Sequence, residues 1–341
     1  MQALSSADAI APAIQRTTGF LFRPFRWGTF LKLCLVALVT EGLGNFHSSH
    51  GGGPSPHPGS TGNPAFDIGP VWIAAIVAMS LLVILLGCLV FYVITRLRFA
   101  YFYCLVTNTR EIRPGWHLYR PQAVRFFWMN LAVGICFVLL VGLMALPFAA
   151  GLWRLFHEVQ AGGSPGIGSI LSYVLPLVPI GILAFCAAIL MDVLLRDWML
   201  PHYALENATA GQAWAAVWDS VSREKGQFFA YALLRLILPI LALIVVAIAL
   251  IIPTLIFAAT VGAVEIGVHS AFAGATGAAE VAGVFLQAFF GVVAFGFAVL
   301  ASICVGGPVS TGIREYALVF YGGRYQKLGD LLTPGPRAGI A

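Results

Sequence analysis

Two ionisable side chains lie inside long apolar stretches of the sequence, where a charge is costly. Asp192 lies about a turn and a half before Trp198, and Arg235 lies about two turns after Phe228. Because the two stretches follow one another, an antiparallel pair of helices would bring both charges to similar depth. We therefore predict an Asp192–Arg235 ion pair. The alternative is that Asp192 pairs with Arg196 on its own helix while Arg235 reaches the membrane surface.

Three histidines form the next candidate for chemistry. His47, His50 and His57 lie in residues 44–70, a stretch rich in glycine, proline and serine that contains no cysteine. This composition is typical of a flexible loop, which does not hold metal ligands in a fixed geometry, so we predict no metal site. The sequence has no HExxH motif, serine–histidine–aspartate set or phosphate-binding glycine loop. We therefore expect neither an enzyme nor a bound cofactor.

The elements that carry these residues are built for lipid. Hydrophobic residues make up 60% of the 341 positions and charged residues 10%, whereas about a quarter of residues are charged in a soluble protein. The net charge is +5, but the basic residues lie where apolar stretches end, as membrane topology places them. This distribution excludes nucleic acid as the expected partner.

The apolar stretches predict an all-α integral membrane protein with six transmembrane helices. Each stretch is long enough to cross a hydrocarbon core roughly 30 Å thick. The predicted spans are residues 27–43, 71–95, 126–150, 170–195, 227–260 and 281–305. We assign residues 1–325 to a single membrane domain, 44–70 to a flexible outer loop and 326–341 to a disordered tail. Pro308 is expected to end the last helix, because proline disrupts a helix interior.

The basic residues divide sharply between the two sides of this topology. Of the 19 lysines and arginines, only Arg154 lies in the loops 44–70, 151–168 and 261–280. Cytoplasmic loops carry an excess of lysine and arginine. The sequence therefore predicts that both termini are cytoplasmic.

Similar motifs follow the second, fourth and sixth predicted spans. They read YCLV from Tyr103, YALE from Tyr203 and YALV from Tyr316, and an arginine precedes each tyrosine. This recurrence predicts three repeated helical hairpins related about an axis along the membrane normal. The alternative is that such similar motifs arise at any membrane boundary, because basic and aromatic residues are expected there. The expected junction anchors are Arg96, Tyr103, Trp116, Arg196, Tyr203, Trp214, Trp218, Arg314 and Tyr316.

The junction after the fourth span has the clearest helical period. Apolar residues occupy positions 210, 213, 214, 217, 218 and 221, which lie on one face of a helix. Thr209 and Gln212 have the spacing of a capping box, in which each side chain satisfies a free backbone N–H. We predict that this cytoplasmic amphipathic helix lies on the membrane surface.

The junctions resemble those of a known family. They read TNTREIRPGWHLYRPQAVRFFW and RDWMLPHYALENATAGQAW. With their spans, from about Phe20 to Tyr325, they are similar to the bacterial six-helix proteins related to the glycerophosphodiester phosphodiesterase membrane domain. The resemblance implies a multi-pass module of the bacterial cytoplasmic membrane. Some members carry a soluble phosphodiesterase domain, but this sequence shows none, so neither that activity nor a family catalytic residue is expected.

These observations favour a non-enzymatic integral membrane protein that organises lipid or a partner at the inner leaflet. Its expected partners are membrane lipids, together with either another membrane protein or further copies of the chain. The alternative is a small-molecule or lipid transporter with a cavity among the helical hairpins. The few polar residues within the spans favour the first prediction, because transporters converge polar groups on a midplane cavity.

Overall fold

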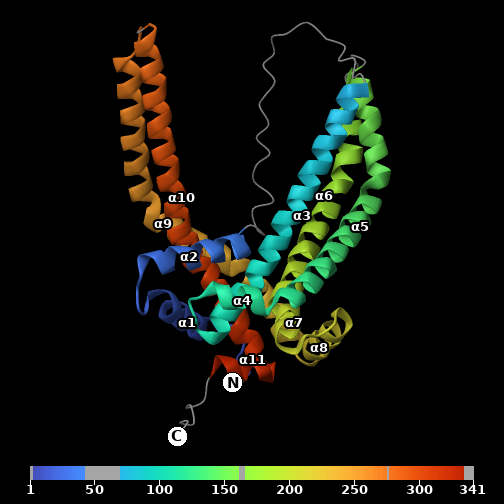
Figure 1. Cartoon of the computed structure of the whole chain (residues 1–341). Coiled ribbons are helices and arrows are strands. Elements are labelled where there is room, and N and C mark those ends of the chain that lie inside the picture. The colour runs from blue at the N-terminus through green and yellow to red at the C-terminus, as the bar shows by residue number, and fades with distance from the viewer. Residues whose placement is uncertain (1–2, 43–69, 161–165, 275, 334–341) are drawn as a thin grey trace. The chain divides into compact units, whose positions relative to one another are not determined.

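The structure is a computed structural model that describes residues 3–42, 70–160, 166–274 and 276–333. Every regular element in these ranges is a helix, which confirms the all-α prediction (Figure 1). The elements are α1 (Ile10–Phe22), α2 (Trp27–Ala37), η1 (Leu38–Gly42), α3 (Pro70–Thr107), α4 (Ile112–Leu118), α5 (Arg120–Gln160), α6 (Ile167–Val193), η2 (Leu194–Met199), α7 (Leu200–Glu206), α8 (Ala210–Arg223), α9 (Lys225–Ala271), α10 (Ala278–Gly322) and α11 (Gln326–Leu332). The histidines His47, His50 and His57 lie outside the described residues.

Five helical segments in the described ranges are long and apolar enough to cross a membrane. They are Ala74–Thr107, Arg120–Gln160, Leu171–Glu206, Lys225–Ala271 and Ala278–Gly322. Each includes most or all of one predicted span and continues beyond it. At 1.5 Å per residue, a helix of 45 residues is about 68 Å long, which is twice the thickness of the hydrocarbon core. The helices therefore indicate a membrane protein whose spanning elements extend past the bilayer.

The chain divides into two compact units, which we describe separately. Unit 1 comprises residues 1–67, 103–111 and 226–323. In it α9 and α10 run side by side as a long hairpin (Figure 1), and their Phe257 and Phe297 rings stack 4.7 Å apart. Helices α1, α2 and η1 pack against the C-terminal part of α10. Figure 1 shows α2 lying across α10 rather than along it. The N-terminal helices and the end of the last long helix thus form one packed body.

The first predicted span, residues 27–43, has a different form from the other five. It consists of α2 and η1, which are 11 and 5 residues long, so it is too short to be counted among the five segments. Phe30, Leu33 and Cys34 of α2 are buried, and so is Glu41 of η1. An apolar stretch with a buried acid at its end packs on protein, because the acid needs a protein partner.

Two glycines of α10 allow α2 to approach closely. A Cβ atom on Gly307 would lie 2.6 Å from Cys34 Cα, and one on Gly306 would lie 2.8 Å from Leu38 Cδ1. Small residues at a helix contact let backbones pack closely in membrane proteins. This glycine pair therefore sets the position of α2 on α10.

The prediction that Pro308 ends the helix is wrong, because α10 continues through it to Gly322.

Unit 2 comprises residues 68–102, 112–225 and 324–341. Its helices α5 and α6 pack against each other, and α7 and η2 continue from α6 at the same end as the start of α5. Phe126 of α5 is fully buried there. Its ring lies 5.4 Å from that of Phe99 on α3 and 5.2 Å from that of Tyr203 on α7, both edge to face. This aromatic cluster joins three helices at the junction end of the unit.

The prediction of a disordered tail from residue 326 is wrong for the part that the structure describes. Residues 326–332 form α11, in which Leu328 and Leu332 are buried at helical spacing, and α11 packs on α7. Lys327 Nζ lies 2.8 Å from Glu206 Oε1, and Arg324 donates to Glu224 Oε2 at 2.6 Å. Two apolar residues and two ion pairs thus dock a segment whose composition alone indicates little order. Residues 334–341 lie outside the described ranges.

The close approach at Gly307 gives a test of the α2–α10 contact. Gly307→Ala should destabilise the protein by about 1–3 kcal/mol, because the new methyl group overlaps the Cys34 backbone. Gly312→Ala is the matched control, since the nearest atom to its Cβ would be Thr17 Oγ1 at an ordinary 3.7 Å. Thermal unfolding in detergent measures both variants. Equal melting temperatures for the two would contradict the packing.

Candidate functional site

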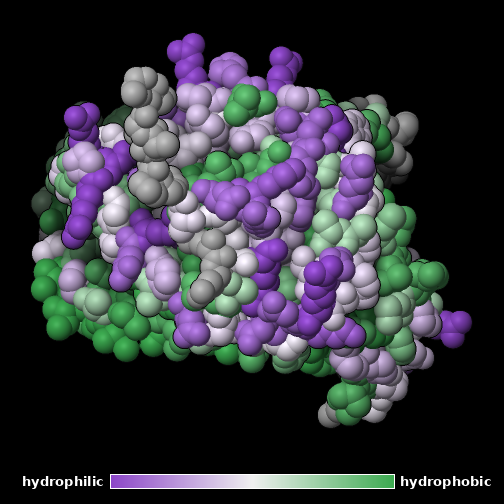
Figure 2. Space-filling model, turned by 90° about the horizontal axis from the view of Figure 1, so that it is seen from below, coloured by the Kyte–Doolittle hydropathy of each residue, from purple (hydrophilic) through white to green (hydrophobic). Residues whose placement is uncertain are grey.

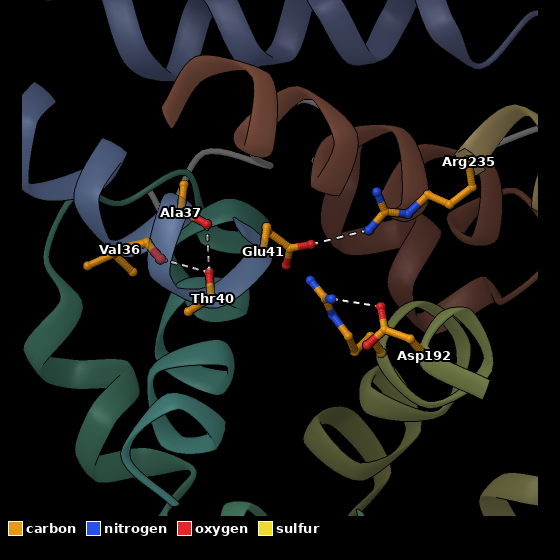
Figure 3. Close-up of polar contacts among 7 residues, drawn as sticks. Val36, Ala37, Thr40, Glu41, Asp192 and Arg235 are labelled. Carbon is orange, nitrogen blue, oxygen red and sulfur yellow. Dashed lines mark hydrogen bonds and ion pairs between the residues drawn. The ribbon is translucent and has the colours of Figure 1, made fainter. Parts of the chain in front are cut away.

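A buried ion pair in unit 1 joins the end of the N-terminal helices to α9. Arg235 Nη2 donates to Glu41 Oε2 at 3.2 Å, and the two side chains are 10% and 5% exposed (Figure 3). Glu41 lies on η1, a π-helical turn. The Thr40 hydroxyl contacts the carbonyl oxygens of Val36 and Ala37 at 2.8 and 3.2 Å. π-Helical turns are often found at functional sites because they redirect a side chain, and here the turn carries the acid.

Asp192 and Arg235 lie in different units, so their predicted ion pair stays a prediction, and each has a partner within its own unit. Asp192 accepts from Arg196 Nη1 at 2.7 Å, one turn along the same helix, as the alternative prediction proposed (Figure 3). Arg235 has Glu41 as its partner. The local partner needs no tertiary docking, so it competes well with a distant one. Arg196 is 2% exposed, while Asp192 is 41% exposed.

A second ion pair, between a partly exposed arginine and a buried glutamate, lies at the contact between α1 and α10. Arg16 Nε donates to Glu315 Oε2 at 2.8 Å, and Arg16 Nη2 donates to the Leu105 carbonyl at 3.3 Å. The Glu315 side chain is 1% exposed. Next to it, the Tyr316 hydroxyl donates to the Ser6 carbonyl at 3.0 Å. These bonds hold the N-terminal segment against the end of α10.

Arg110 closes the other end of α1. Its guanidinium donates to the carbonyl oxygens of Phe20, Arg23 and Pro24. The last carbonyl groups of a helix have no partner within the helix, and a cation there also offsets the negative end of the helix dipole. Arg110 therefore acts as a C-terminal cap for α1, contributed by a residue distant in sequence.

Several of the predicted junction anchors contact residues within their own unit. In unit 2, Arg96 Nη2 donates to the Trp116 carbonyl at 2.8 Å, and its guanidinium carbon lies 4.1 Å from the Trp116 ring centroid. This cation–π contact fastens α4 to α3. The Tyr203 hydroxyl donates to Met129 Sδ at 3.1 Å. In unit 1, the Tyr316 ring stacks on that of Tyr231 at 5.1 Å, Arg314 is buried, and Tyr103 is half-buried.

Helix α8 has a capped N-terminus, a buried face and an exposed face. It starts at Ala210, and Gln212 Oε1 accepts from the Thr209 N–H at 3.0 Å, as the capping pattern predicts. Ala213 and Val217 are buried, whereas Trp214 and Trp218 are 48% and 60% exposed. The two indole rings stack with centroids 6.3 Å apart. The small apolar residues thus face the protein, and the tryptophans face outward.

Hydrophilic side chains gather over the face seen in Figure 2, with hydrophobic side chains at its margins. The described residues contain no group of three or more histidine, cysteine, aspartate or glutamate side chains placed to hold a metal ion. The ionisable groups described above instead neutralise one another or bind backbone carbonyls. The arrangement is suited to fixing helix ends at a membrane boundary.

The sequence prediction missed Glu41, Arg16 and Glu315. Glu41 carried a usable signal, because it is an acid inside a predicted span, residues 27–43, where a charge needs a partner. Glu315 and Arg16 lie at predicted boundaries, where charged residues are ordinary. Their burial depends on α1 docking on α10, which no local pattern indicates.

The chain matches one known sequence family over most of its length. The model of a family of unknown function, DUF7544, matches residues 4–331. A search of curated proteins and a search of solved structures each gave no match. The family match makes no link to the glycerophosphodiester phosphodiesterase membrane domain, so that resemblance stays a prediction.

The Glu41–Arg235 pair predicts an asymmetric mutational response. Glu41→Gln should destabilise the protein by about 3–5 kcal/mol, because Arg235 loses its carboxylate partner while remaining buried. The double variant Glu41→Leu/Arg235→Met should recover most of this loss. Asp219→Asn is the control, since the Asp219–Arg223 pair is 61% and 75% exposed and such a pair contributes about 0–1 kcal/mol. Denaturation in detergent measures the stability of each variant. If Glu41→Gln lost no more stability than Asp219→Asn, the buried Glu41–Arg235 pair would be contradicted.

Proposed function

The chain belongs to the DUF7544 family, and from its own residues we propose a non-enzymatic role in organising lipid or a partner at the inner leaflet. The membrane is proposed to be a bacterial cytoplasmic membrane. Five apolar helices provide the anchorage. A second copy of the chain is one such partner, and another membrane protein is the other.

The exposed tryptophan pair of α8 is the observation that carries this proposal. Helix α8 fills the connection between Glu206, where one candidate span ends, and Lys225, where the next begins. Its connection to both spans keeps it near the membrane boundary. Tryptophan is enriched at this depth because its ring is apolar while its N–H is polar. Two outward indoles therefore offer an apolar surface to the lipid interface or to a partner lying there.

A parity argument supports six membrane crossings. Arg16 binds Glu315, and Tyr316 binds the Ser6 carbonyl, so the N-terminal segment lies beside the end of α10. A chain whose two ends lie on one side of a membrane crosses it an even number of times. The five helices supply an odd number. The sixth crossing that this parity requires is the one predicted at residues 27–43, and the arginine-rich junctions favour the cytoplasm as the shared side.

A recurring aromatic contact supports the proposed repeat of helical hairpins. In the hairpin of α5 and α6, Tyr203 at the end of the second arm packs on Phe126 at the start of the first. In the hairpin of α9 and α10, Tyr316 at the corresponding end packs on Tyr231, here with the rings stacked rather than edge to face. Each tyrosine hydroxyl also donates a hydrogen bond. In both hairpins a tyrosine near the end of the second arm thus contacts an aromatic ring near the start of the first.

Transport is the second candidate function, and one observation favours it. The Glu41–Arg235 pair places two opposite charges on helical segments of a strongly apolar unit, one of them on a π-helical turn. Charges at such positions mark ion and substrate pathways in transporters. An ion pair whose charges neutralise each other can also serve only to hold two helices together. This observation therefore carries less weight than the outward tryptophans.

Retention of lipid and partner after gentle extraction tests the proposed function. The wild-type chain, expressed at native level and extracted in a lipid-preserving copolymer, should keep phospholipid or a stoichiometric partner through purification. Trp214→Ala/Trp218→Ala should lower that retention at least about tenfold, because burying one large apolar side chain contributes about 1.5–3 kcal/mol.

The control for this experiment is Trp72→Ala/Trp153→Ala. These tryptophans are 63% and 65% exposed, but they lie at the opposite ends of α3 and α5 from the arginine-rich junction. Phospholipid and protein per chain are measured by phosphorus assay and mass spectrometry. Equal retention in the wild type and both double variants would contradict the proposal.

A further inference from the structure

Three arginines on α4 and the start of α5 remain without acidic partners. Arg113, Arg120 and Arg125 are exposed, and none of them forms an ion pair with a described residue. The other exposed arginine of a junction helix, Arg223, lies 2.7 Å from Asp219 Oδ2. The unpaired set, called the α4–α5 arginine patch below, is therefore available to an external anion.

We propose that this patch binds the phosphate groups of anionic phospholipids in the surrounding leaflet. The inference rests on the proposed function and names the class of lipid. Guanidinium groups bind phosphate through two parallel N–H···O bonds, and each basic residue near an anionic membrane surface contributes about 1 kcal/mol. The three arginines lie on α4 and the first two turns of α5, so separate headgroups at one junction can reach them.

The exposed face of α5 connects the patch to the lipid tails. Starting at Arg125, this face continues with Trp128, Ala132, Ile135 and Leu139, all of them exposed. Their spacing of three and four residues keeps them on one side of the helix. On the opposite side, Phe126 and Phe127 are buried. A phospholipid lying along this face has its acyl chains on the apolar residues and its phosphate at Arg125.

The Trp128 ring marks the depth at which the headgroup begins. It is 63% exposed and stands one turn from Arg125, the arrangement of an interfacial aromatic below a basic residue. A free phosphate ion would gain nothing from the apolar part of this face. The continuity of basic, aromatic and aliphatic residues therefore favours a phospholipid over a soluble phosphate.

The rest of the junction holds α4 in place, so the backbone that carries the patch is positioned before a lipid binds. Arg96 on α3 fastens Trp116 through its carbonyl and its ring. The Phe99 ring lies 6.0 Å from that of Tyr119, which joins α4 to α5, and 5.4 Å from that of Phe126. Arg113 and Arg120 therefore stand on either side of a clamped connection. Such preorganisation lowers the entropy lost on binding.

Binding of short-chain phospholipids to the purified full chain in detergent tests the inference. The probes are dioctanoyl phosphatidylglycerol and dioctanoyl phosphatidylcholine, and native mass spectrometry titration gives both dissociation constants. The wild type should bind phosphatidylglycerol at least about tenfold more tightly. Each arginine replaced by glutamine should weaken that binding about fivefold, so Arg113→Gln/Arg120→Gln/Arg125→Gln should abolish the preference.

A matched control removes the same charge elsewhere in unit 2. Arg154→Gln/Arg223→Gln/Lys327→Gln should keep the preference, because Arg223 and Lys327 already have carboxylate partners and Arg154 lies at the far end of α5. Variants are compared only if their melting temperatures and gel-filtration profiles match those of the wild type. If the patch variant does not fold, Arg125→Gln alone carries the test with its fivefold loss.

The outcomes separate this inference from the proposed function. Equal binding of the two lipids, an unchanged preference in the patch variant, or displacement of phosphatidylglycerol by equimolar inorganic phosphate would overturn the phospholipid site. Tryptophan-dependent retention would then still support the proposed function. Loss of that retention, with the lipid preference intact, would instead overturn the wider role and leave an anionic lipid site on a membrane protein.

Discussion

The cost of an unpaired charge in an apolar surrounding governs this structure. Removing an ionised group from water costs several kcal/mol unless a partner and hydrogen bonds compensate it. Glu41 meets this requirement with Arg235, and Glu315 meets it with Arg16. Both pairs draw the N-terminal segment onto the α9–α10 hairpin, so charge compensation and helix packing reinforce each other. Arg113, Arg120 and Arg125 lack such a partner and are exposed, and lipid phosphates are the partners that we propose for them.

Close helix packing at two glycines, which have no side chain, makes the Glu41–Arg235 ion pair possible. Gly306 and Gly307 leave room for Cys34 and Leu38, and this close approach brings η1 to the level at which Glu41 reaches α9. Helices in lipid gain little from burying apolar residues, because the lipid tails are equally apolar. Close contact and a small number of strong polar bonds therefore hold unit 1 together. In unit 2 the aromatic cluster around Phe126 has the corresponding role.

Local patterns predicted the local features well. The apolar stretches gave five of the long helices, the Thr209–Gln212 spacing gave the start of α8, and the spacing of Asp192 and Arg196 gave their pair as an alternative. The partners of Arg235 and Arg16 lie 194 and 299 residues away, and no spacing rule reaches that far. The order of α11 was missed for the same reason, since it depends on docking against α7.

The central proposal is that both ends of the chain lie with the arginine-rich junctions on one side of the membrane. Its most direct test is labelling by an impermeant maleimide in sealed vesicles, using single cysteines in a cysteine-free background at Ala7→Cys, Leu331→Cys and Glu158→Cys, all exposed positions. We predict that the first two react from one side and Glu158→Cys from the other. Labelling of Ala7→Cys and Leu331→Cys from opposite sides would contradict the account, because the chain would then cross the membrane an odd number of times.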